Sequence, residues 1–104
     1  MEKKEFNKVL LSKVSPRLKK LYETSDKIIR YFNRNNSHPE MITVSVLLQN
    51  AMMSKDIDDI KEQSSLIKDM SIYLDIHIIS WIAKEMYFII SGEEMALEMM
   101  LENM

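Results

Sequence analysis

Apolar residues recur at intervals of three or four along most of this chain, and that spacing is typical of amphipathic helices. The first run extends from Glu2 to Val14, and Ser15-Pro16 then fits an N-cap followed by a proline in the first helical turn. We therefore expect a short first helix and a second one that starts at Ser15-Pro16 and ends near Asn33. The second helix has a continuous apolar stripe, made of Leu18, Leu21, Tyr22, Ser25, Ile28, Ile29 and Phe32.

A polar loop and a third helix follow. Asn33 to His38 is rich in residues that favour turns, and Ser37-His38-Pro39-Glu40 fits a capping box. The next helix is predicted to run from Pro39 to about Met53. Its buried side is expected to consist of Met41, Val44, Leu47, Leu48 and Ala51. The β-branched residues in this segment leave a strand as the alternative.

The stretch from Ser71 to Ile90 is the most apolar part of the chain, with fourteen apolar residues among its twenty. One series follows the four-three spacing of a packed helical seam: Ile72, Ile76, Ile79, Ala83, Met86 and Ile90. A second series makes the segment apolar nearly all round: Leu74, Ile78, Trp81 and Phe88. Such a helix must be covered on most sides by its own chain or by another one. We expect it to be the central helix.

The helix boundaries around this stretch follow from local signals. Ser54 is the predicted N-cap of the helix before it, because acidic residues follow in the first turn. From Lys55 to Ile90 the spacing fits either one helix or two. We favour a break near Met70-Ser71, since a single helix of that length would be long for a domain of this size. Ser91-Gly92 then predicts a stop and the start of a last helix that ends at Met104.

The fold class follows from these elements and from composition. With 104 residues the chain is expected to form one helical domain, residues 1–104. One glycine and two prolines are too few for the many turns of a sheet-rich fold. We predict an all-α, compact bundle of four to five helices with an apolar central helix and the capacity to dimerise. Charged residues inside the apolar stretch, such as Asp75 and Lys84, argue against a membrane span.

Catalytic and metal-binding chemistry is poorly represented. The chain has no cysteine, and its two histidines, His38 and His77, are far apart. Its only glycine is Gly92, so a glycine-rich phosphate loop is excluded. The acidic residues from Asp56 to Asp59 fit a helix start better than a cation site. We expect no enzymatic activity, no cofactor and no bound metal.

Charge is distributed unevenly. Residues 1–40 carry a balance of +5 and residues 41–104 a balance of −7, which predicts pairing between the halves or a head-to-tail assembly. Basic residues recur on the polar side of the second helix: Arg17, Lys20, Lys27 and Arg34. This face is open to three interpretations, namely contact with nucleic acid, contact with an acidic protein surface, and plain solvation.

Methionine is abundant, with ten residues that include Met95, Met99 and Met100 near the end of the chain. Thioether side chains adapt to irregular partners. The main hypothesis is therefore a non-catalytic interaction module: a cytoplasmic chaperone, adaptor or inhibitor that covers an apolar helix of a partner and forms homo-oligomers. The expected partner-binding residues are Trp81, Tyr87, Phe88, Met95, Met99 and Met100. The alternative is a dimeric DNA-binding transcriptional regulator that uses Arg17, Lys20, Lys27 and Arg34 on phosphates.

Overall fold

The computed structural model describes residues 1–35 and 39–104, and the first helix in it, α1, runs from Lys3 to Asn35 without a break. The predicted restart at Ser15-Pro16 is therefore wrong. The apolar stripe continues in register across the proline, and its members are fully buried: Leu10, Val14 and Leu18. Because one side of the helix is held by the core on both sides of Pro16, packing outweighs the local signal to stop.

The structure also shows how α1 accommodates Pro16. Proline lacks the N–H group that would bond to the carbonyl of Ser12, and its ring crowds that carbonyl. Pro16 is exposed and lies on the side of α1 away from the core, so the lost bond faces solvent rather than the interior. The hydroxyl of Ser15 donates a hydrogen bond of 2.8 Å to the carbonyl of Leu11 within the same turn. Ser15 thus acts inside the helix and is not a cap.

Helix α2 extends from Pro39 to Met53, as predicted, and the strand alternative is wrong for this segment. Proline at the first position suits a helix start, where its missing N–H costs nothing. Four of the five predicted core residues are buried: Met41, Val44, Leu48 and Ala51. Leu47 is half-buried. The predicted capping box begins at Ser37, which lies outside the described residues, as does His38.

Helix α3 runs from Ile57 to Leu74, two residues later than the sequence predicts. The N-cap is Asp56, whose carboxylate accepts a hydrogen bond of 3.0 Å from the backbone N–H of Asp58. The hydroxyl of Ser54 instead accepts from the backbone N–H of Asp56 at 3.1 Å and orders the turn before the helix. Capping by Asp56 places Ile57 and Ile60 in the core.

The apolar stretch from Ser71 to Ile90 is not one helix, which corrects the expectation of a single central helix. The predicted break exists, but it falls at Asp75-Ile76 rather than at Met70-Ser71. Asp75 adopts the left-handed conformation, with φ 46°, which aspartate tolerates better than most residues. The carbonyl of Ile76 then accepts hydrogen bonds from the N–H groups of Ile79 and Ser80 at 3.0 and 3.1 Å.

Helix α4 extends from His77 to Glu102 and passes through Ser91-Gly92, so the predicted stop there is also wrong. Gly92 does not have the positive φ of a C-cap glycine. Buried residues occur on both sides of it, Ile90 before and Leu97 after. The core therefore holds one continuous helix where glycine alone would permit an end.

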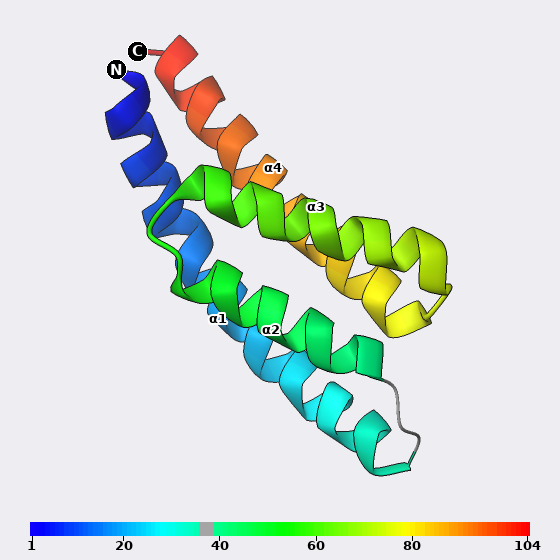
Figure 1. Ribbon diagram of the computed structural model, residues 1–104. Helices are drawn as coiled ribbons and strands as arrows, with labels where there is room; N and C mark the ends of the chain where they lie inside the picture. Colours follow the sequence, from blue (N-terminus) through cyan, green and yellow to red (C-terminus); the bar gives the residue numbers. More distant parts are fainter. Residues whose placement is uncertain (36–38) are drawn as a thin grey trace.

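These four helices form an up-and-down bundle in which each helix packs against its chain neighbour and α4 closes the ring against α1 (Figure 1). The molecule is elongated, 52 × 22 × 18 Å. The start of α1 and the end of α4 lie side by side and extend beyond the other two helices (Figure 1). Two ion pairs link α4 to its neighbours: Arg17 to Glu93 at 3.2 Å and Lys61 to Glu94 at 3.3 Å. The first joins the basic half of the chain to the acidic half.

Candidate interaction surfaces

Helix α4 presents large apolar side chains on two opposite sides. The inner side is buried in the bundle and includes Ile79, Ile82 and Met86. The outer side carries four exposed residues, here named the outer stripe. They are Trp81, Phe88, Met95 and Met99, with exposed fractions of 38, 62, 61 and 59%. Their spacing of seven, seven and four residues keeps them on one side of a continuous helix. The absence of a helix end at Gly92 is what unites Phe88 with Met95.

The other two predicted partner-binding residues lie outside this stripe. Tyr87 is 63% exposed, and it borders the seam between α3 and α4. Met100 follows Glu93 by seven residues, so it lies on the side of α4 that faces α1. It is 56% exposed and belongs to the end of α4, which extends beyond α2 and α3 (Figure 1). The Tyr87 ring nevertheless lies edge-on to the Phe88 ring, with centroids 5.8 Å apart. The structure therefore brings five of the six residues together and separates Met100.

A hollow of about 310 Å³ lies between α1 and α4. It is lined by residues from both predicted binding sets, the basic set on α1 and the apolar set on α4. Arg17 and Lys20 line it from α1, while Trp81 and Glu85 line it from α4. The guanidinium of Arg17 is paired with Glu93, so its charge is partly neutralised. An anionic ligand in this hollow would meet Lys20 beside the carboxylate of Glu85.

Lys20 also belongs to a row of basic residues along α1. Because α1 is one helix, Lys13, Lys20, Lys27 and Arg34 recur every seven residues along it. All four are exposed, and none forms an ion pair with a described residue. They form a basic line that borders the hollow at Lys20, while Arg17 lies off the line and is paired with Glu93 of α4.

The seam between α3 and α4 contains two adjoining hollows of about 290 and 450 Å³. Both are lined by Lys68, Ala83 and Tyr87. Serines and apolar residues of both helices complete their walls. The charged residues of the lining are Lys61, Lys68, Lys84 and Glu94, of which Lys61 and Glu94 are paired. The sequence reasoning did not identify this groove, since its residues come from two helices.

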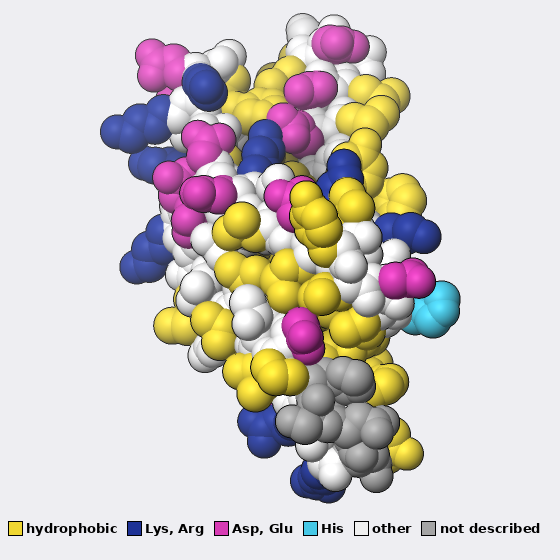
Figure 2. Space-filling view, turned by 45° about the vertical axis from the view of Figure 1, so that its right-hand side comes forward, with side chains coloured by type: hydrophobic (Ala, Val, Ile, Leu, Met, Phe, Trp, Pro, Cys, Tyr) yellow, Lys and Arg dark blue, Asp and Glu magenta, His cyan; other side chains and the backbone are white. Residues whose placement is uncertain are grey.

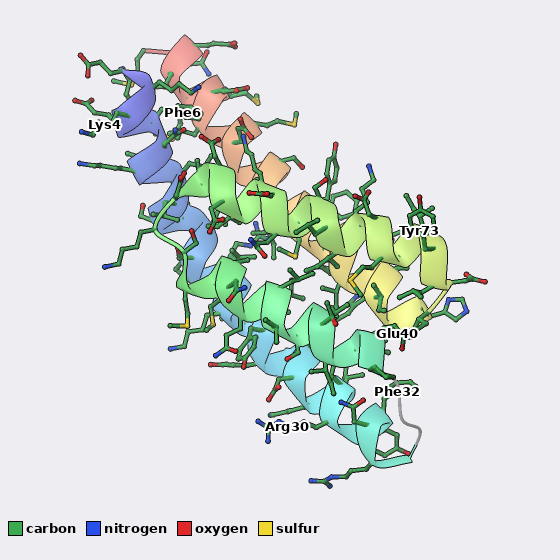
Figure 3. The ribbon with its side chains drawn as sticks, in the orientation of Figure 1. Lys4, Phe6, Arg30, Phe32, Glu40 and Tyr73 are labelled. Carbon is green, nitrogen blue, oxygen red and sulfur yellow. The ribbon has the colours of Figure 1, made fainter. Side chains whose placement is uncertain are left out.

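An apolar patch across α2 and α3 was also missed. Leu66 and Tyr73 of α3 are exposed and line a largely apolar hollow of about 440 Å³ together with Thr43 and Leu47 of α2. Ile42 and Val46 are further exposed apolar residues of α2. Hydrophobic side chains gather across this face in Figure 2, and Tyr73 projects from the end of α3 in Figure 3. A signal existed: residues 39–53 are apolar on nearly every side, so one core face could not cover them all.

His77 is exposed at the first position of α4. Residues 1–35 and 39–104 contain no group of three histidine or carboxylate side chains placed to hold a metal ion. Among the same residues, no helix combines the length and the apolar composition needed to cross a membrane. No family model, curated protein or solved structure matches this chain.

Proposed function

We propose that this protein is a non-catalytic, cytoplasmic interaction module that covers an apolar helix of a partner protein with the outer stripe of α4. The observation that carries the proposal is the exposure of Trp81, Phe88, Met95 and Met99 on the outer side of a helix whose inner side is already packed. Isolated exposed apolar residues are common on proteins, but a row of four large ones along one helix is typical of a contact surface.

The chemistry of the stripe favours a helical partner of variable sequence. Two of the four residues are methionines, which adjust their shape to irregular partners, and the other two are aromatic anchors. A helix laid along α4 would reach all four through contacts at helical spacing. Adaptors, chaperones and inhibitors that mask an apolar helix share this requirement.

The test compares tagged wild-type protein with a Met95→Asp plus Met99→Asp variant in the native cell. Both side chains are exposed, so the variant is expected to keep its helical circular dichroism and to lose its partner. The matched control is Met53→Asp plus Met104→Asp, since these methionines are exposed elsewhere. The apolar helix of the captured protein, made as a peptide, should bind the wild type and the control but not the stripe variant. Equal binding by all three would refute the proposal.

A second candidate is a nucleic-acid-binding regulator that uses the basic line on α1. The observation that favours it is the continuity of α1, which aligns Lys13, Lys20, Lys27 and Arg34 without an ion-pair partner among the described residues. Cationic side chains along one helix can follow phosphates.

This candidate predicts DNA binding that weakens steeply with salt and is abolished by Lys20→Glu plus Lys27→Glu. The control, Lys4→Glu plus Lys8→Glu, makes the same change in charge on exposed residues of α1 outside the line. If both variants lose salt-dependent DNA binding equally, DNA is attracted by the net charge of α1 and not by the basic line.

A further inference from the structure

We propose that the outer stripe of α4 is self-complementary, so that two copies of this chain pair through their α4 helices in an antiparallel, two-fold symmetric dimer. The inference rests on the proposed function, in which the outer stripe is a contact surface. When no partner protein is bound, a second copy of this chain covers the stripe. A two-fold dimer requires one surface patch to fit itself. The outer side of α4 meets that requirement in spacing, in size and in charge.

The spacing is that of a helical seam. Trp81, Phe88 and Met95 recur every seven residues, and Gly92 and Met99 each lie four residues beyond a member of that series. From Phe88 to Met99 the steps are four, three and four, which is the a/d pattern of paired helices. All of these positions are exposed, and this series is distinct from the buried seam on the inner side.

The size of the side chains sets the register. Apart from its chain neighbours and the backbone of its own helical turns, a Cβ atom placed on Gly92 would meet no atom of a described residue within 4 Å, so the position is an open gap in a row of large side chains. In an antiparallel pair centred at the level of residue 90, Phe88 of one copy faces Gly92 of the other. The same register places Trp81 opposite Met99. A large ring then fills each gap, and the helices can approach closely at the centre.

Charge supports the same register. Lys84, Ser91 and Glu98 lie on one flank of the stripe, at intervals of seven residues. Neither Lys84 nor Glu98 forms an ion pair with a described residue. In this register Lys84 of each copy lies within two residues, about 3 Å along the helix axis, of Glu98 of the other. Parallel pairing would place Lys84 beside Lys84 and Glu98 beside Glu98, which disfavours that orientation.

The first experiment is a charge swap followed by sedimentation equilibrium. The wild type is expected to dimerise. Lys84→Glu and Glu98→Lys each create two like-charge contacts and are expected to raise the dimer dissociation constant about tenfold. The double variant Lys84→Glu plus Glu98→Lys should restore the wild-type value. A monomeric wild type, or a double variant as weak as the singles, would overturn the proposal.

The second experiment tests orientation directly, and it is clean because the chain has no cysteine. Ser91→Cys should cross-link to itself with a short bis-maleimide, since the two Ser91 positions meet at the centre. Lys84→Cys alone should not, because an antiparallel pair separates the two Lys84 positions by about 18 Å along the helix axis. A mixture of Lys84→Cys and Glu98→Cys proteins should cross-link between the two. Efficient self-cross-linking of Lys84→Cys would show a parallel pair and overturn the proposal.

Failure of this inference and failure of the proposed function are separable. A chain that stays monomeric but binds a partner helix through the stripe would remove the dimer alone. A chain that dimerises as described but binds no partner helix would remove the adaptor function alone. If both hold, a partner-helix peptide should convert dimer to monomer, since both occupy the same stripe. If the peptide binds and the dimer persists, the claim that the partner helix and the second copy use the same stripe is wrong.

Discussion

The two sides of α4 have nearly the same chemistry and opposite surroundings. The inner side carries Ile79, Ile82 and Met86 in full contact with the other helices, while the outer side carries Phe88, Met95 and Met99 in solvent. Both sides repeat at helical spacing, and periodicity alone does not distinguish them. The difference teaches that an apolar stripe becomes core only where neighbouring helices cover it. The surplus stripe is available for other contacts.

The largest expected effect tests this contrast with one residue type on each side. Met86→Ala should lower the free energy of unfolding by about 2–5 kcal/mol, because Met86 is fully buried and its loss leaves a cavity. Met99→Ala should change the free energy of unfolding of the monomer by less than about 0.5 kcal/mol, since Met99 is 59% exposed. Urea unfolding of dilute protein measures both. Equal losses would show that the outer stripe is also packed within one chain.

The next effect concerns α1, where the inner stripe stabilises a helix despite a proline on its outer side. Pro16→Ala should raise the free energy of unfolding by about 1–3 kcal/mol, because it restores the N–H group that bonds to Ser12. Pro39→Ala is the matched control. Pro39 occupies the first position of α2, where proline is favourable, so its replacement should bring no comparable gain. A gain at Pro39 equal to that at Pro16 would contradict the interpretation.

A smaller effect is expected inside the core. Ser25 is fully buried, and its hydroxyl has no hydrogen-bond partner within residues 1–35 and 39–104. Ser25→Ala should therefore stabilise the fold by about 1 kcal/mol, since it removes an unpaired polar group from the interior. Ser12→Ala, on an exposed residue whose hydroxyl donates to the carbonyl of Val9 at 2.7 Å, should be nearly neutral. Thermal unfolding distinguishes the two, and destabilisation by Ser25→Ala would reveal a role for the hydroxyl.

The smallest expected change in the free energy of unfolding comes from Gly92→Ala, a substitution that should affect the fold and the dimer in opposite directions. Gly92→Ala should raise the free energy of unfolding of the monomer by about 0.5–1 kcal/mol, because Gly92 is helical and has open space around it. The same methyl group should weaken the dimer, since it occupies the gap that Phe88 of the second copy would enter. Paired measurements of unfolding and of sedimentation would show opposite signs. A variant that is more stable and equally dimeric would contradict the register.

Some of the structure could be predicted from local patterns. The all-α class, the bounds of α2 and most of its core followed from periodicity and from a proline suited to a helix start. The break inside residues 55–90 was also expected, although its position at Asp75 depends on a backbone conformation that the pattern does not report. The two helix ends predicted at Ser15-Pro16 and Ser91-Gly92 do not occur.

The candidate surfaces, like the fold, could be predicted from the sequence only in part. The six residues expected to bind a partner are all exposed, but their use in binding stays a prediction. Tyr87 and Met100 lie off the outer stripe because adjacent helical positions point about 100° apart. The patch across α2 and α3 was missed because only one apolar side of residues 39–53 was considered.

The sequence by itself determined that this chain forms helices with more apolar surface than one small bundle can bury, because that follows from residue type and spacing. The tertiary structure alone decided which apolar sides are covered and where helices continue. Proline and glycine bias a backbone by about 1–3 kcal/mol, and a long run of buried side chains on one side of a helix outweighs that bias. Packing therefore united Phe88 with Met95 across Gly92 and left their shared stripe exposed.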